Sequence, residues 1–411
     1  MRHVIVMVTS SYPRFPGDSV GTFMEPIARS IAARGHAVHV VAPWHPLVRR
    51  GAREGGVQFH FYKYAPVRAL NVFGYAAAMR ADVKLRGAAF VAAPLALAQG
   101  WRMARHVART MHATMVHAHW VIPGGVTGWL AAPELPLVVS LHGSDVFVAE
   151  KLMPARIAAR RVFRHAGAVT ACSPDLARRA IRLGADPTRM EVVPYGVDTK
   201  RFKPDGVDRS ALRSSVGANA QDLFIFAAGR LVKKKGFEYL IDAALKLPQR
   251  IHPILAIGGA GDLDSELRDR AIAAQQARIT FLGNLTQDQV AAYLAAADIA
   301  VVPSVRDEAG NVDGLPNIVL ESLAAGVPLI TTAAGGIGDV VTNDQTAIVV
   351  PERDASAICQ AIISLADEAE TRRRLGAQGR ALVEREFGWE RTAERMEHAY
   401  DRALALNYRG R

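Results

Sequence analysis

The chain has 411 residues, half of them hydrophobic, and a formal net charge of +11. Because one hydrophobic core stops growing beyond about 300 residues, two or three domains are expected. No window approaches the roughly 20 apolar residues that span a bilayer, and the N-terminal apolar run 4–8 is too short for a signal peptide. The two cysteines, Cys172 and Cys359, lie far apart, which is typical of a reducing compartment. We therefore expect a globular cytoplasmic protein without a disulfide.

The charge is distributed unevenly along the chain. Residues 1–205 contain 27 Lys or Arg against 12 Asp or Glu, whereas residues 206–411 contain 23 against 27. A basic first half indicates a polyanionic partner there: nucleic acid, anionic lipid or a phosphorylated acceptor. Nucleic acid is disfavoured, because the aromatic residues are sparse, do not alternate with the basic ones and form no known RNA or DNA motif.

Short apolar runs alternate with helical stretches in both halves. In the first half, strands are expected at 3–9, 36–42, 115–120, 137–142, 168–173 and 191–193, with the first helix at 23–34. After a polar linker at 204–219, strands are expected at 223–228, 254–257, 279–282, 299–302, 329–332 and 347–350. This alternation predicts parallel sheets wrapped by helices. The expected fold class is therefore α/β, with two Rossmann-like doubly wound domains.

The predicted boundaries are 1–205 for the first domain and 206–388 for the second, followed by a tail at 389–411. Residues 389–406 have the spacing of an amphipathic helix. Two doubly wound domains imply that a ligand binds in a cleft, at the carboxyl ends of the strands.

Two segments of the first half follow expected strands. The loop 10–22 contains Gly17 and Gly21, which allow close backbone approach, but it is neither a dinucleotide-binding fingerprint nor a Walker loop. His142, in the run Ser-Leu-His-Gly-Ser-Asp at 140–145, ends a strand and is expected to face the cleft. There its ring could hydrogen-bond a ligand and stabilise developing charge. His117 and His119 are interpreted as structural.

A basic helix is predicted at 152–164. Its arginines are interspersed with apolar residues on neighbouring faces: Arg156, Arg160, Arg161 and Arg164 among Leu152, Met153, Ile157, Val162 and Phe163. Such a mixed surface favours docking on an anionic membrane; the alternative is an ordinary solvated helix.

Two loops of the second half follow strands and precede helices. Residues 229–236 place Arg230 and Lys235 where they can grip a diphosphate, the Arg through its flat fork and the Lys as a point charge. Residues 257–262 contain Gly258 and lack the dinucleotide spacing, so we interpret them as a second loop on the ligand side.

The most informative segment is 313–328. Asp313 precedes a predicted apolar helix at 318–325, and Glu321 lies on that helix, which ends at Gly326. The backbone N–H groups of Asn317 and Ile318, at the helix start, would suit a phosphate. Two carboxylates that accept hydrogen bonds from different hydroxyls, beside a phosphate site, match the groups of a nucleotide sugar.

This segment resembles the acidic pair of retaining glycosyltransferases of the two-Rossmann-domain (GT-B) type, especially glycosyltransferase family 4. The family pattern is Glu-Gly-x-Pro, four residues, then Glu-Ala-x-Ala-x-Gly-x-Pro. This chain has Asp313 and Ser322 where Glu and Ala are commoner. Other matches at 10–22, 140–145, 195–198, 229–236 and 303–304 spread the resemblance over nearly the whole chain.

The resemblance implies a role for each of these residues. Arg230 and Lys235 would hold the donor diphosphate, Glu321 the ribose, and Asp313 hydroxyls of the transferred sugar. His142 would lie beside the reacting carbon, and the tail would cross back onto the first domain. The implied activity is transfer of a sugar from a UDP- or GDP-sugar to an acceptor hydroxyl, with retention of configuration.

No cofactor beyond this co-substrate is expected. No His, Cys or Asp cluster has metal-site spacing, so a metal-independent donor site follows, in which the Arg and Lys replace a cation. The expected partners are the donor, a glycan or lipid-linked acceptor and an anionic membrane surface, which would place the protein at the inner face of the plasma membrane. The nearest alternative is a nucleotide-sugar epimerase of the same architecture. A nicotinamide-dependent oxidoreductase is excluded by the missing glycine fingerprint.

Overall fold

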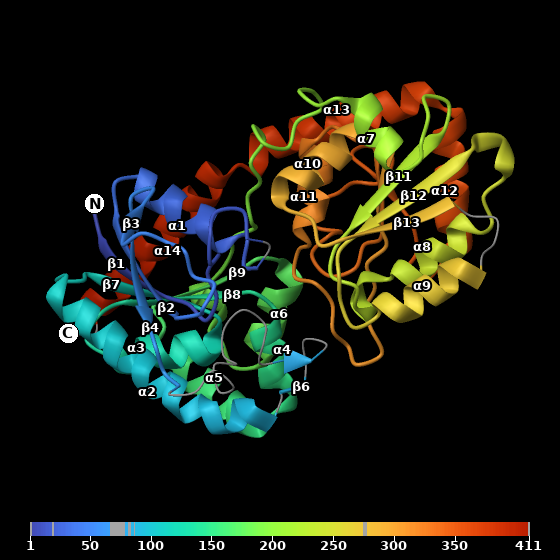
Figure 1. The fold of residues 1–411 in the computed structure, drawn as a ribbon. Coiled ribbons are helices and arrows are strands. Elements are labelled where there is room, and N and C mark those ends of the chain that lie inside the picture. Colours follow the sequence, from blue (N-terminus) through green and yellow to red (C-terminus); the bar gives the residue numbers. More distant parts are fainter. Residues whose placement is uncertain are drawn as a thin grey trace. The chain divides into compact units, whose positions relative to one another are not determined.

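A computed structural model describes residues 2–18, 20–65, 79–80, 84–85, 87–273 and 278–409. The chain forms two compact units: Met1–Tyr195 with Trp389–Arg411, and Gly196–Gly388. Each consists of a mainly parallel sheet with helices on its faces (Figure 1). The predicted fold class is confirmed.

The first unit is built on an eight-stranded sheet, in the order β10-β9-β8-β7-β1-β2-β4-β3. The strands are β1 (Val4–Val8), β2 (Ala37–Pro43), β3 (Arg53–Glu54), β4 (Val57–Tyr62), β7 (Met115–His119), β8 (Leu137–Leu141), β9 (Ala168–Ala171) and β10 (Met190–Val192), with a separate antiparallel pair of β5 (Met79–Arg80) and β6 (Lys84–Leu85). The helices are α1 (Met24–Ala33), α2 (Gly87–Thr110), η2 (Val121–Gly125), α3 (Val126–Ala131), α4 (Ser144–Lys151), α5 (Met153–His165), α6 (Pro174–Arg182), η3 (Pro187–Arg189) and α14 (Trp389–Arg409).

Successive side chains of β7 point to opposite faces of the sheet and show which helix covers each face. The Nδ1 atom of His117 lies 2.9 Å from the Tyr400 hydroxyl of α14, so this residue faces α14. On the other face, a Cβ added at Gly128 of α3 would lie 2.9 Å from Val116. Since successive strand residues point to opposite faces, α14 and α3 cover opposite sides. The C-terminal helix therefore belongs to the first unit, where Glu397 also pairs with Arg34.

The second unit has a six-stranded parallel sheet, in the order β13-β12-β11-β14-β15-β16. The strands are β11 (Leu223–Ala228), β12 (Pro253–Gly258), β13 (Arg278–Gly283), β14 (Ile299–Val302), β15 (Leu329–Thr331) and β16 (Ile348–Val349). The helices are α7 (Arg209–Ser215), η4 (Lys233–Lys235), α8 (Phe237–Ala244), η5 (Gln249–Ile251), α9 (Asp264–Ala273), α10 (Gln287–Ala296), α11 (Asn317–Ala324), α12 (Ala355–Asp367) and α13 (Ala369–Glu386).

Strand β11 shows how this sheet is covered. Ile225 belongs to a core shared with α8 and α12, whereas the next residue, Phe226, stacks on Tyr293 of α10 with ring centroids 5.5 Å apart. Figure 1 shows α8, α9 and α12 on one side of the strands and α10 and α11 on the other. Both faces are thus apolar and covered, as a parallel sheet requires.

The chain passes from the first unit to the second at residues 195–196, whereas the sequence predicted 205–206. Val197 pairs with Gly388, and Phe202 is buried. These contacts hold the segment 196–205 on the second unit, although it precedes the first strand of that unit by many residues.

Candidate functional site

The second sheet reverses its order at β11, which pairs with β12 on one side and β14 on the other. Ligands of doubly wound sheets bind outside the carboxyl ends of the strands at such a switch point. The loops that leave β11 and β14 there are 229–236 and 303–316. They contain Arg230, Lys235 and Asp313, which the sequence predicted as site residues.

Glycines let these loops pack closely on one another. Gly236 has φ +66°, and a Cβ there would lie 2.1 Å from the carbonyl oxygen of Pro303. A Cβ at Gly259 would lie 1.8 Å from the carbonyl oxygen of Gly229. The Val305 N–H donates to the Lys234 carbonyl at 2.9 Å. The loop after β11 is therefore held between the loops after β12 and β14.

Two lysines share the Asp313 carboxylate. Lys235 Nζ lies 2.7 Å from Oδ2 and Lys234 Nζ 3.0 Å from Oδ1, and the three side chains are only 14–15 % exposed. Burial opposes ionisation of Asp313, but the two ammonium charges outweigh it and hold the pKa of this carboxyl well below its usual range. Asp313 is thus an ionised carboxylate bound by two lysines. A diphosphate could take the place of this carboxylate on the two lysines.

Glu321 lies on α11, eight positions after Asp313. Its Oε1 accepts a hydrogen bond from Gln287 Nε2 at 3.2 Å, at the start of α10. Burial raises the pKa of Glu321 to about 7, although this hydrogen bond and the charges of Lys235 and Arg201 lower it. The charge of Lys235 lowers the pKa of both Glu321 and Asp313, so this lysine links the two predicted carboxylates electrostatically.

The remaining predicted residues of this unit lie around the same strand ends. Arg230 is exposed in the loop after β11. Asn317 and Ile318 begin α11. A Cβ at Gly258 would lie 2.5 Å from the side chain of Leu285, so this glycine packs against the loop after β13. Their predicted roles toward a donor remain predictions. Within the described ranges, no group of three or more His, Cys, Asp or Glu side chains could hold a metal ion.

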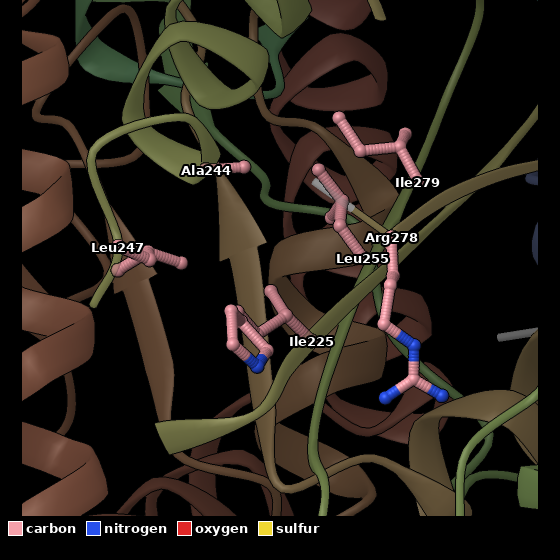
Figure 2. A pocket seen from close by; sticks show the side chains of 7 residues that line it. Ile225, Ala244, Leu247, Leu255, Arg278 and Ile279 are labelled. Atoms are coloured by element: carbon pink, nitrogen blue, oxygen red, sulfur yellow. The ribbon is translucent and has the colours of Figure 1, made fainter. Parts of the chain in front are cut away.

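A small apolar hollow lies at the opposite ends of the same strands (Figure 2). It is lined by Ile225, Ala244, Leu247, Pro253, Leu255, Arg278 and Ile279. Pro253 and Arg278 are the first residues of β12 and β13, so this hollow is at the amino ends of the strands. It offers no polar constellation besides Arg278, which pairs with Asp222 at 2.8 Å.

In the first unit, His142 follows β8 and is fixed by Asp145. This buried carboxylate accepts hydrogen bonds from the backbone N–H groups of Val121 at 2.7 Å and Gly143 at 3.1 Å. Burial raises the pKa of Asp145, while these donors oppose the shift. Asp145 therefore ties the turn after β8 to the turn after β7.

The predicted hydrogen bond from His142 to a sugar stays a prediction, and the structure shows that both ring nitrogens already have partners. Its Nδ1 lies 2.7 Å from the Tyr195 hydroxyl and its Nε2 2.9 Å from His119 Nδ1. Both ring nitrogens are thus engaged, and a substrate hydroxyl would have to displace one partner. Burial, with a smaller effect of His117, lowers the pKa of His142 to about 3, so the ring is neutral at physiological pH.

Gly17 and Gly21 lie in the loop after β1, of which Ser19 is outside the described residues. Their φ angles are +84° and +64°, and a Cβ at Gly21 would lie 3.1 Å from Ser11 Oγ. Phe23, which follows this loop, packs against His142 with ring centroids 4.8 Å apart and the ring planes tilted by 35°. The loop and His142 therefore lie side by side in the first unit.

Four residues of these sites were not predicted. Lys234 stands in a run of three lysines, and nothing in the sequence shows that it contacts Asp313 together with Lys235. Gln287 reaches Glu321 across 34 positions. His119 was interpreted as structural, and Tyr195 was noted only as a family match. These contacts are tertiary, and no local spacing encodes them.

Two family descriptions match the chain. "Glycosyltransferase Family 4" matches residues 20–201, and "Glycosyl transferases group 1" matches residues 208–382. A GDP-mannose-dependent monoacylated alpha-(1-6)-phosphatidylinositol monomannoside mannosyltransferase of Corynebacterium glutamicum is 35% identical over 63% of this chain and 68% of its own length. A D-inositol 3-phosphate glycosyltransferase of Rhodococcus erythropolis is 30% identical over 80% of this chain and 75% of its own length. The chain belongs to glycosyltransferase family 4, so it is a glycosyltransferase.

Further relatives support the same fold. A putative teichuronic acid biosynthesis glycosyltransferase, TuaC of Bacillus subtilis, is 27% identical over 96% of this chain and 97% of its own length. Among solved structures, Anabaena HepE in complex with UDP and glucose has a TM-score of 0.76 at 18% identity, covering 97% of this chain and all of HepE. The architecture of two Rossmann-like domains is therefore GT-B, as the sequence predicted.

Proposed function

We propose that this glycosyltransferase moves a sugar from a UDP- or GDP-sugar to an acceptor hydroxyl, with retention of configuration and without a metal ion. The observation that carries the proposal is the pair of lysines on Asp313, at the switch point of the second sheet and beside Glu321. A nucleotide diphosphate sugar has a dianion, a ribose and a hexose in sequence, and the site has two ammonium groups and two carboxylates.

The proposed chemistry follows from these charges. Lys235, with Arg230, binds the diphosphate and neutralises the charge that develops as the sugar–phosphate bond breaks. Asp313, released from Lys235, accepts hydrogen bonds from hydroxyls of the transferred sugar. Glu321 accepts from the ribose hydroxyls in place of Gln287. The acceptor hydroxyl attacks from the face that the diphosphate leaves, and a phosphate oxygen takes its proton.

A donor screen tests this function. Thermal unfolding with UDP- and GDP-sugars in the presence of a chelator identifies the donor, and NMR of the product reports the anomeric configuration. Retention with full activity in the chelator is expected. Inversion, or loss of activity on chelation that added Mg²⁺ restores, would contradict the proposal. Conversion of the donor to an epimer without any acceptor would establish the epimerase alternative.

We propose an acceptor of the cell envelope, either lipid-linked or polymeric. The support comes from relatives named as acting on phosphatidylinositol mannoside and in teichuronic acid biosynthesis. Incubating the purified enzyme and its donor with a total lipid extract and with a polysaccharide extract separates these two classes. Transfer to neither extract, with an active donor, would contradict this assignment.

We also propose that α5 docks on the anionic inner face of the membrane. Met153 is 61 % exposed and Ile157 46 %, and Arg161 and Arg164 are exposed on the same helix. Among the described residues, no helix is long and apolar enough to cross a bilayer, so docking would depend on such a surface. Two of the four predicted arginines have another role: Arg156 donates to the Ala149 carbonyl and Arg160 to the Leu183 carbonyl.

Vesicle sedimentation tests the docking. Binding is expected with anionic lipid, to fade with salt, and to fall in the double variant Arg161→Gln/Arg164→Gln. The matched control is Arg373→Gln/Arg385→Gln, which removes two exposed arginines of α13 and should bind like the wild type. Equal binding to neutral and anionic vesicles, or equal losses in the two double variants, would contradict the proposal.

A further inference from the structure

In the first unit, His142 belongs to a set of three hydrogen-bonded side chains, with Tyr195 on one side of its ring and His119 on the other. Tyr195 Oη lies 2.7 Å from His142 Nδ1, and His142 Nε2 lies 2.9 Å from His119 Nδ1. The rings of His119 and His142 are nearly parallel, at 11° and 5.2 Å between centroids. Phe23, Trp120 and Tyr195 surround the His142 ring, with centroids 4.6 to 5.9 Å away. The imidazole plane is therefore fixed on several sides.

A second set of hydrogen-bonded side chains consists of Ser140, His117 and Tyr400. His117 Nε2 lies 2.7 Å from Ser140 Oγ and His117 Nδ1 2.9 Å from Tyr400 Oη. The His117 and His119 rings pack with their centroids 4.2 Å apart. Helix α14 thus supports the second set through Tyr400, and the second set meets the first where these two rings pack.

The hydrogen bonds that join His119, His142 and Tyr195 have a defined order of donor and acceptor. Burial lowers the pKa of both His119 and His142, so each ring is neutral and carries one N–H. His119 Nε2 is buried and has no hydrogen-bond partner in the described part of the chain. An unpaired lone pair is tolerated better in a protein interior than an unpaired N–H. His119 therefore carries its proton on Nδ1 and donates it to His142 Nε2.

This order determines the tautomer of His142. Because its Nε2 accepts from His119, its own proton lies on Nδ1 and is donated to the Tyr195 oxygen. The Nδ1–H group of His142 is consequently directed at the Tyr195 oxygen.

We propose that His119 and Tyr195 are positioning residues: His119 holds His142 as the Nδ1–H tautomer, and Tyr195 keeps that N–H directed until a sugar hydroxyl replaces it. The tautomer assignment stands on the first unit alone. Only its use toward a sugar rests on the proposed function.

NMR of the full chain labelled with ¹⁵N-histidine tests the tautomer directly. The His142 resonance, assigned by its absence in His142→Asn, should show a protonated Nδ1 and an unprotonated Nε2. His119→Asn keeps a donor near the Nδ1 position and lacks only the unpartnered Nε2, so the tautomer should persist. His119→Leu removes the donor, and His142 should change to the Nε2–H form.

Turnover should follow the tautomer. With the identified donor, His119→Leu should lower kcat about tenfold or more and leave the donor KM within about threefold, and His119→Asn should restore most of the loss. Tyr400→Phe removes one hydroxyl from the second set. It should lower Tm and leave the His142 resonances unchanged.

Several results would overturn the proposal. These are an Nε2–H tautomer of His142 in the wild type, an unchanged tautomer in a folded His119→Leu variant, and a Tyr400→Phe spectrum that shifts His142 as much as His119→Leu does. If His119→Leu does not fold, the wild type and His119→Asn still decide the assignment. An Nδ1–H tautomer in a protein that transfers no sugar would contradict the proposed function and leave the assignment standing.

Discussion

Asp313 is held by two cations before any ligand arrives. A carboxylate buried with two lysines is electrostatically satisfied, whereas removal of the carboxylate leaves two neighbouring ammonium groups without the anion that they share. In the same arrangement, Asp313 and a diphosphate would compete for the two lysines. We therefore expect the residue that the sequence assigned to the sugar also to control the affinity for the nucleotide.

Asp313→Asn tests this coupling. Because the variant frees both lysines from their anion, UDP or GDP should bind about tenfold more tightly, while turnover falls about tenfold or more and Tm decreases. Isothermal titration, a transfer assay and thermal unfolding measure the three effects. Asp205→Asn is the control, since Asp205 pairs with Lys203 at 3.1 Å but is 77 % exposed, and exposed pairs contribute little. Weaker nucleotide binding by Asp313→Asn would show that no competition exists.

Asp313→Glu examines the departure from the family pattern. The longer side chain restores the commoner residue and keeps the charge, so transfer activity should survive within about tenfold. A changed preference among donor sugars is the expected second effect, because the carboxylate moves by one methylene toward the sugar. Competition between two donor sugars in one assay measures this preference. Complete loss of activity would mean that the Lys234 and Lys235 geometry admits only the shorter acid.

Glu321 should give the protein a pH dependence near neutrality. Its pKa rises from 4.5 to about 7 on folding, so the folded chain keeps a proton that the unfolded chain releases. The resulting stabilisation, on the order of 3 kcal/mol, is fully present below pH 4.5 and is lost as the pH rises to about 7. Nucleotide binding should show the opposite trend, strengthening through this range, because the ribose hydroxyls donate to the ionised carboxylate.

Glu321→Gln is the matched variant for this effect. Denaturant unfolding and titration with UDP or GDP, each at several pH values, should lose their dependence between pH 4.5 and 7 relative to the wild type. The same slopes in variant and wild type would show that another group titrates.

At the scale of elements, the candidate donor site depends on the packing of loops at the strand ends. Gly236 combines φ +66° with an approach of 2.1 Å from its Cβ position to the Pro303 carbonyl, whereas Gly217 has φ +78° and nothing within 4 Å. Both substitutions to Ala incur the strain of positive φ, but only Gly236→Ala also displaces a backbone.

Gly236→Ala should therefore lower the free energy of unfolding by about 1–3 kcal/mol more than Gly217→Ala and weaken nucleotide binding about tenfold or more. Denaturant unfolding and isothermal titration measure both effects. Equal losses in the two variants would show that the loop contact does not position Lys235.

The elements were largely predictable, because strands buried on both faces read as continuous apolar runs. Strand β11 was predicted at its observed residues, and helix α11 begins one residue before the predicted start. Strand β4 was not predicted, since its alternating aromatic and polar residues are mostly half-buried. The candidate site was predictable only as separate motifs: the contacts of Lys234 with Asp313 and of Gln287 with Glu321 join elements that are distant in sequence.

At the scale of the molecule, the two units differ in the chemistry that they display. The second unit, slightly acidic in sequence, concentrates cations at one switch point, and the basic first unit contains His142 with its neutral histidine neighbours. In both, the residues of interest follow the carboxyl ends of parallel strands. The central claim is that the second unit binds the diphosphate of a nucleotide sugar through Lys235 and its neighbours.

Isothermal titration of the full chain with UDP and GDP, in the presence of a chelator, tests that claim most directly. The wild type should bind at least one of the two nucleotides, and Lys235→Ala should weaken this binding about tenfold or more, since a charge-assisted contact contributes roughly 1.5–3 kcal/mol. Lys246→Ala is the control, because Lys246 Nζ contacts the hydroxyl of the exposed Ser356 at 2.9 Å, and it should bind like the wild type. Binding of neither nucleotide, or equal affinity in Lys235→Ala and the wild type, would contradict the account.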